Sequence, residues 1–308
     1  MKRVNKELTL SLAALLLCIG AVGYFLSEIQ NKKTNTHTDL FTLIPPESHA
    51  VLYIGNVASF QQFLQQPVAS RIFDRHLPPS YLSIIRNAGA HTAFLIAFGP
   101  EGTLLYGNPD NKHFSVIRKK AYEDPAAHYS PLRQKYAGSE LIYYPAGGKD
   151  FIGYFYRDGI LMTGYNKKLL EKSVLQYKVT RTPDAVLALL RKEINRNVPV
   201  NFLFRAPQFG LDLSLDSVRL FTGRNGWVSA DCTLQHDTLC AFGSVPLDAT
   251  DTKALNDSVT RLFADTLERR LHGLFPELNF HSEFSKENNQ LYYAVSGHSV
   301  STVNPSYE

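Results

Sequence analysis

Short apolar runs alternate with helical hydrophobic patterns along most of the chain. The segment HAVLYIGN (49–56) predicts a strand, and Asn56 at its end predicts the N-cap of a helix over 57–66. The segment 91–107 predicts a hairpin that turns at its Pro-Glu-Gly sequence. Residues 107–138 contain three Pro and no sustained period, so they are expected to be irregular.

A meander of three strands is predicted around residues 143–165, where aromatic residues surround two glycine-containing turns. Asp158-Gly159 is a strong two-residue hairpin turn, because Gly accepts the positive φ that such turns need. This turn places Phe155 opposite Met162 in the second and third strands of the meander.

A four-residue loop over 146–149 predicts the register of the first two strands. It places Tyr144 opposite Phe151 and Ile142 opposite Gly153. Strand alternation then separates an aliphatic face from a tyrosine face. Packing into the core and exposure as a ligand or partner surface are the two alternatives for the tyrosine face. The tyrosines predicted to share that face are Tyr143, Tyr154, Tyr156 and Tyr165.

The rest of the chain continues the mixture of strands and helices. Asn166 is the predicted cap of one helix, and Pro183 at a first helical position begins another. Further segments are predicted as a strand at 199–205, a second meander at 218–247, an amphipathic helix at 251–271 and a closing hairpin at 278–297. This order predicts an α+β fold of antiparallel meanders packed by helices.

The N-terminal pattern is different, because residues 8–26 carry no charge. As a helix this run spans about 30 Å, close to the hydrocarbon thickness of a bilayer. Basic residues within 1–7 predict a cytoplasmic tail, so the chain after the span is expected outside the cytoplasm as a single-pass inner-membrane protein with a periplasmic domain. The alternative is a signal peptide cleaved at the small residues 21–23. The polar residues 27–39 are a predicted tether.

The exported region is predicted to form two α+β halves, 40–178 and 183–308. Its composition is globular, with 44% hydrophobic and 19% charged residues, and is rich in aromatics, with 19 Phe and 16 Tyr. The net charge of +4 is diffuse and does not indicate a nucleic-acid partner.

Signatures of metal, cofactor or nucleophile chemistry were sought in the ten His and three Cys residues. No HExxH, CxxC, GxSxG or GxGxxG motif occurs, so no catalytic, cofactor or metal residues are predicted. His281 and Glu283 share one strand face, and a solvated face opposite Phe280 and Phe284 explains them without a metal.

Cys232 and Cys240 are the remaining candidates for a covalent link. A turn at 236–237 pairs Cys232 with Ala241 and puts Cys240 on the opposite strand face. This geometry argues against a disulfide unless the loop has three residues, so the bridge is left open.

Three segments resemble a class of membrane-anchored envelope proteins of Bacteroidetes-type bacteria that carries a domain-of-unknown-function label. They are LFTLIPPESHAVLYIGN (40–56), FYRDGILMTGYNKKLLEKSVLQ (155–176) and GWVSADCTLQHDTLCAFG (226–243). The resemblance implies an envelope location and an α+β architecture, and it supplies no established active site to carry over to this chain.

The expected function is non-enzymatic binding or scaffolding in the cell envelope. The expected partners are the lipid bilayer, through residues 8–26, and an envelope protein or glycan. The alternative is an envelope hydrolase or transferase whose site is assembled from dispersed residues.

Overall fold

The computed structural model describes residues 39–147, 150–179, 185–209, 214–215, 218–219, 226–235, 238–247, 255–276, 278–287 and 290–299. Its first elements are η1 (Leu40–Leu43), β1 (Ala50–Ile54), α2 (Val57–Leu64), α3 (Pro67–His76), α4 (Pro79–Arg86), β2 (Phe94–Gly99), β3 (Gly102–Gly107), α5 (Asn111–Ile117), η2 (Arg118–Glu123), β4 (Leu132–Tyr136), β5 (Ser139–Gly147), β6 (Asp150–Arg157), β7 (Ile160–Gly164) and α6 (Lys167–Lys178). They are followed by α7 (Ala185–Glu193), β8 (Val200–Arg205), η3 (Ala206–Phe209), β9 (Ser214–Leu215), β10 (Val218–Arg219), β11 (Trp227–Gln235), β12 (Thr238–Pro246), α9 (Asp257–Leu274), β13 (Leu278–Glu287) and β14 (Gln290–Ser299).

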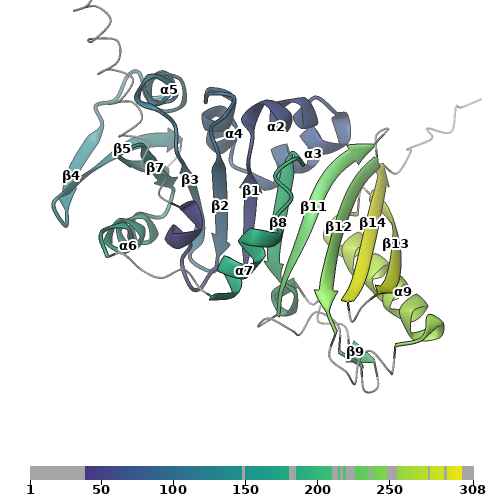
Figure 1. Cartoon of the computed structure of the whole chain (residues 1–308). Helices are drawn as coiled ribbons and strands as arrows, with labels where there is room; N and C mark the ends of the chain where they lie inside the picture. Colours follow the sequence, from purple (N-terminus) through teal and green to yellow (C-terminus); the bar gives the residue numbers. More distant parts are fainter. Residues whose placement is uncertain are drawn as a thin grey trace, which may run out of the picture.

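One antiparallel sheet of 12 strands organises the molecule, in the order β13-β14-β12-β11-β8-β1-β2-β3-β7-β6-β5-β4 (Figure 1). The strands β9 and β10 form a separate small ribbon. The predicted α+β class is therefore confirmed. The predicted halves are 40–178 and 183–308. Strands from both lie in one sheet, because β1 of the first pairs with β8 of the second. The division into two halves stays a prediction.

The order of strands repeats outward from the central pair β1–β8. On one side β1 is followed by the hairpin β2–β3 and then by β7, the last strand of a later meander. On the other side β8 is followed by the hairpin β11–β12 and then by β14, the last strand of a later hairpin. A helix precedes the later strands on each side, α5 and α9. The two sides thus share one plan, and β12 and β14 take the places of β3 and β7.

Helices cover the two faces of the sheet unequally. We call the face under α2, α3, α4, α5 and α9 the back face, and the face under η1, α6 and α7 the front face (Figure 1). Alternation in β1 sends Leu52 and Ile54 to the back core and Val51 to the front core. Burial of each such side chain contributes about 1.5–3 kcal/mol of hydrophobic stabilisation.

Local signals for helix starts match the structure where they can be compared. The side chain of Asn56 accepts a hydrogen bond from Ser59 N, and that of Asn166 accepts one from Leu169 N. The start predicted at Pro183 lies outside the described residues. The long helix begins later than predicted, with Asn256 as its cap.

The prediction of irregular structure over 107–138 is wrong. This segment contains the helix α5, a turn of π-helix at η2 and the edge strand β4. The available signals were Asp110, whose side chain caps α5 through His113 N, and the apolar residues Phe114 and Ile117 that α5 buries. The prolines lie outside these elements and did not exclude them.

Candidate functional site

The Asp158-Gly159 turn sets the geometry of the predicted tyrosine face. Both residues have positive φ, 52° for Asp158 and 76° for Gly159, which matches the tight turn predicted for them. Phe155 pairs with Met162, so this part of the predicted register is confirmed.

The register between β5 and β6 differs from the prediction by one residue. Tyr144 pairs with Ile152 and Tyr143 with Gly153, because the pairing shifts between Pro145 and Gly147. A bulge of this kind adds one residue to one strand, and a shift of one residue moves every earlier side chain to the other face. The placement of Tyr143 on the tyrosine face is therefore wrong.

Tyr143 belongs to the front core instead. Its ring packs with Phe155, Leu170 and other apolar side chains and is only 5% exposed. Gly153 lies directly beneath the ring, since a Cβ on Gly153 would lie 2.5 Å from Tyr143 Cε1. Burial raises the pKa of Tyr143 to about 12.

Tyr154 and Tyr156 lie on the back face, as predicted, and helix α5 covers both. The ring of Tyr156 stacks on Phe114 with centroids 3.6 Å apart, and Tyr154 meets Phe114 edge-on at 5.6 Å. The Tyr156 hydroxyl lies 2.9 Å from Asn111 Oδ1 and 3.1 Å from the Pro109 carbonyl oxygen, to which it donates. Burial raises the pKa of both phenols, that of Tyr156 to about 12. These two tyrosines are parts of the core.

Tyr165 is the predicted site residue that remains at the surface, with 39% exposure. Its hydroxyl shares a 2.7 Å hydrogen bond with Ser80 Oγ. Tyr165 borders an open hollow of about 490 Å³. This hollow lies between the β2–β3 turn, the start of α4 and the start of α6. Its other lining residues are Pro78, Glu101, Gly102, Thr103, Asn166 and Lys167. A partner surface at Tyr165 stays a prediction.

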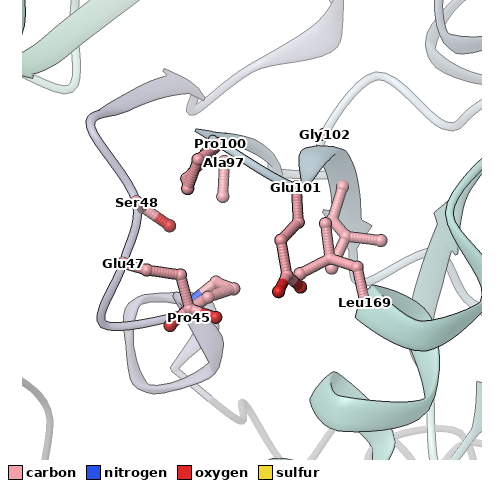
Figure 2. A pocket seen from close by; sticks show the side chains of 10 residues that line it. Pro45, Glu47, Ser48, Ala97, Pro100, Glu101, Gly102 and Leu169 are labelled. Atoms are coloured by element: carbon pink, nitrogen blue, oxygen red, sulfur yellow. The ribbon is translucent and has the colours of Figure 1, made fainter.

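A narrow crevice lies on the other side of the same β2–β3 turn (Figure 2). Its volume of about 10 Å³ is room for one water molecule. Glu47 and Glu101 stand on opposite sides of it, and both reach Lys172, at 3.8 Å and 2.8 Å from its Nζ. The hydrogen bond from Lys172 to Glu101 raises the pKa of Lys172. A lysine acts as a general base at neutral pH only when its pKa is lowered, and that of Lys172 is raised. We therefore interpret Glu47, Glu101 and Lys172 as a surface ion-pair network.

The front face of β12, β14 and β13 forms a third surface, which we call the open face. Helix α9 packs behind these strands, and no described helix covers them in front (Figure 1). Strand alternation and the register assign its central side chains. They are Cys240, Phe242, Ser244, Tyr292, Ala294 and Ser296.

Two aromatic rings stand exposed on the open face. Phe242 is 42% exposed and Tyr292 is 40% exposed. The sequence analysis missed both rings. Strand alternation puts Phe242 on the same face as Cys240 and Ser244, and the buried Val245 on the other face. An aromatic residue in the polar phase of an alternating strand was the signal that could have identified it.

Polar side chains share the open face with these rings. Thr238 Oγ1 lies 2.9 Å from His298 Nδ1, and His281 Nε2 lies 3.4 Å from Glu283 Oε1. Within the described residues, no group of three or more His, Cys, Asp or Glu side chains could hold a metal ion. As predicted, Phe280 and Phe284 pack on the other face, against the core under α9.

The cysteines fit the predicted register. Cys232 pairs with Ala241, so Cys232 points to the back face and Cys240 to the open face. Both are free thiols. Burial raises the pKa of Cys232 to about 12, so this thiol is not poised as a nucleophile.

Comparison with known proteins supports the fold. No protein-family model matches the chain, and no curated protein matches it. Among solved structures, crystal form I of the Treponema protein TP0453 matches with a TM-score of 0.52 and 13% identity, covering 86% of this chain and 94% of that chain. Crystal form IV of TP0453 matches with a TM-score of 0.46 and 12% identity, over 84% and 92% of the two chains. At such identity, the form I match shows a similar fold alone.

No helix among the described residues is long and apolar enough to span a membrane. The span predicted at 8–26 lies outside those residues.

Proposed function

We propose that this protein is a membrane-anchored, extracytoplasmic binding or scaffolding protein of the cell envelope. Residues 8–26 serve as the inner-membrane anchor and 27–39 as the tether. The uncharged apolar run and the basic residues before it support the anchor.

The end of the proposed tether is held firmly by the folded region. Asp39 accepts a hydrogen bond from Phe41 N and forms an ion pair with Arg191 of α7. The next residues, Leu40, Phe41 and Leu43, are buried in the front core. A pull from the membrane would therefore act on a packed segment of the folded region.

The observation that carries the binding role is the open face. Phe242 and Tyr292 expose about two-fifths of their surface on strands whose back face is fully packed. Exposed aromatic rings supply large contact area at low entropic cost, and they dominate binding energy at many recognition surfaces. The alternative of a hydrolase or transferase gains no support from the ion pairs of Lys172, because its raised pKa keeps the amine protonated and unable to accept a proton at neutral pH.

Photo-crosslinking of the full-length protein in its native membranes tests the proposal. A benzoylphenylalanine at Phe242 should give discrete crosslinked adducts on illumination. The matched control is the same residue at Phe151, which is 50% exposed on the distant strand β6. Equal crosslinking from the two positions, or none from Phe242, would contradict a binding role for the open face.

Fractionation tests the anchor in the same preparation. The full-length chain should sediment with membranes, and residues beyond Asp39 should be cleaved only by protease added on the exported side. A soluble mature protein that begins near Tyr24 would contradict the anchor.

A further inference from the structure

We propose that the open face binds a neutral glycan, with Phe242 and Tyr292 as the platform on which sugar rings stack. This inference rests on the proposed binding function and names the class of partner. Pyranose rings present C–H groups on one face and hydroxyls at their edges. A surface that recognises them therefore needs exposed aromatic faces surrounded by hydrogen-bonding groups.

The register brings the two rings together. Phe242 pairs with Ala294, and Ser244 pairs with Tyr292, so Phe242 and Tyr292 are diagonal neighbours on adjacent strands. Such positions are about 7–8 Å apart, within reach of each other for aromatic side chains. The cross-strand partners of Phe242 are Ala294 and Asp231, and those of Tyr292 are Ser244 and Ser285. None of these side chains is bulky, which leaves the ring faces accessible. Two adjacent rings of this kind can support consecutive sugar units.

The charge of the open face disfavours an anionic ligand. Its described side chains include no Lys or Arg, whereas nucleic acids and anionic membranes are bound through such cations. Glu283 lies beside His281. Glu283 and Glu287 are both diagonal neighbours of Tyr292. Asp231 on β11 pairs directly with Phe242. Carboxylates near the rings can accept hydrogen bonds from sugar hydroxyls, and they repel an anion.

The groups around the rings match sugar hydroxyls. Ser285 pairs with Tyr292, and Ser296 pairs with both Cys240 and His281, so hydroxyl and imidazole groups flank the platform. Two sheets that pack face to face need interdigitating apolar side chains, and burial of these hydroxyls without partners would be unfavourable. Pairing of the open face with a second copy is therefore disfavoured.

The same front face can be compared in the other half of the strand order, where helices cover it. There β3 and β7 take the places of β12 and β14, and their front-facing side chains include Leu104, Tyr106 and Met162. Those residues are buried beneath α6 and its neighbours. The chain thus places apolar residues where a helix covers the front face, and hydroxyls with two exposed rings where none of the described helices does.

An array of immobilised neutral oligosaccharides tests the inference with full-length protein in detergent. The array carries glucans, mannans, xylans, galactans and chitin fragments. The protein should bind at least one class, and Phe242→Ala and Tyr292→Ala should each weaken that binding by about tenfold or more. Phe151→Ala, which removes a ring that is at least as exposed elsewhere, should leave it unchanged.

Absence of binding to every class, or binding that Phe242→Ala and Tyr292→Ala leave intact, would overturn the glycan assignment. Concentration-dependent dimers that Tyr292→Ala abolishes would assign the open face to a second copy instead. Failure on the array together with discrete protein adducts from position 242 would leave the proposed function standing and make the partner a protein. The two proposals therefore fail separately.

Discussion

Four tyrosines with similar sequence surroundings occupy different environments, and packing on each strand face explains why. Tyr143 faces α6, Tyr154 and Tyr156 face α5, and Tyr165 lies just past the end of β7. Tyr156 keeps its ring packed while its hydroxyl donates to polar atoms near the start of α5, the arrangement expected for an amphipathic ring at the rim of a core. Strand alternation assigned the face for three of them, but it could not show which faces helices cover.

Truncation should distinguish the buried tyrosines from the exposed one. Tyr154→Ala should lower the free energy of unfolding by about 2–5 kcal/mol, because it leaves a cavity among Phe114, Tyr122 and Tyr144. Tyr165→Ala should change it by less than about 1 kcal/mol. The measurement is urea unfolding followed by the fluorescence of Trp227, the single Trp of the chain. Equal losses in the two variants would contradict these placements.

The hydroxyl of Tyr143 allows a finer test. It is buried, and no partner for it exists among the described residues. Removal of a buried, unpartnered hydroxyl removes a desolvation cost without removing a hydrogen bond. Tyr143→Phe should therefore leave the unfolding free energy unchanged or raise it by up to about 1 kcal/mol. A clear loss of stability would show that the hydroxyl has a partner.

At the scale of elements, features set by neighbouring residues were predictable and features set by distant strands were not. The Asp158-Gly159 turn and the Asn56 and Asn166 caps follow from local chemistry, and the structure has all three. The bulge between Pro145 and Gly147 depends on how β5 fits against β6, so turn residues alone could not reveal it. The order of the 12 strands depends on contacts between distant parts of the chain.

The turn at Asp158-Gly159 can be tested directly. Gly159→Val should lower the free energy of unfolding by about 1–3 kcal/mol, because a β-branched residue resists the φ of 76° found there. Gly273→Ala is a matched glycine control inside α9, where an added Cβ meets nothing within 4 Å. That variant should be neutral or more stable by up to about 1 kcal/mol. An unchanged Gly159→Val variant would contradict the turn.

At the scale of the whole molecule, an open sheet must protect its two edge strands from pairing with other chains. The edge strand β4 is short and carries Arg133 and Lys135, which discourage pairing. The other edge strand, β13, is ten residues long and is shielded by α9. Glu268 accepts hydrogen bonds from Ser282 N and Ser282 Oγ, and His272 Nδ1 lies 2.9 Å from the Leu278 carbonyl oxygen. Side chains of one helix thus occupy backbone groups along this edge.

Removal of that shield should make the protein self-associate. Glu268→Ala frees the Ser282 N–H to pair with another strand, so light scattering should show an average mass that rises with protein concentration. The loss of hydrogen bonds to a carboxylate should also lower the free energy of unfolding by about 1.5–3 kcal/mol. Asp265→Ala removes the same charge from an exposed position of the same helix, and it should stay monodisperse and stable. If both variants behave alike, the effect comes from charge, and the backbone of β13 does not depend on Glu268 for its protection.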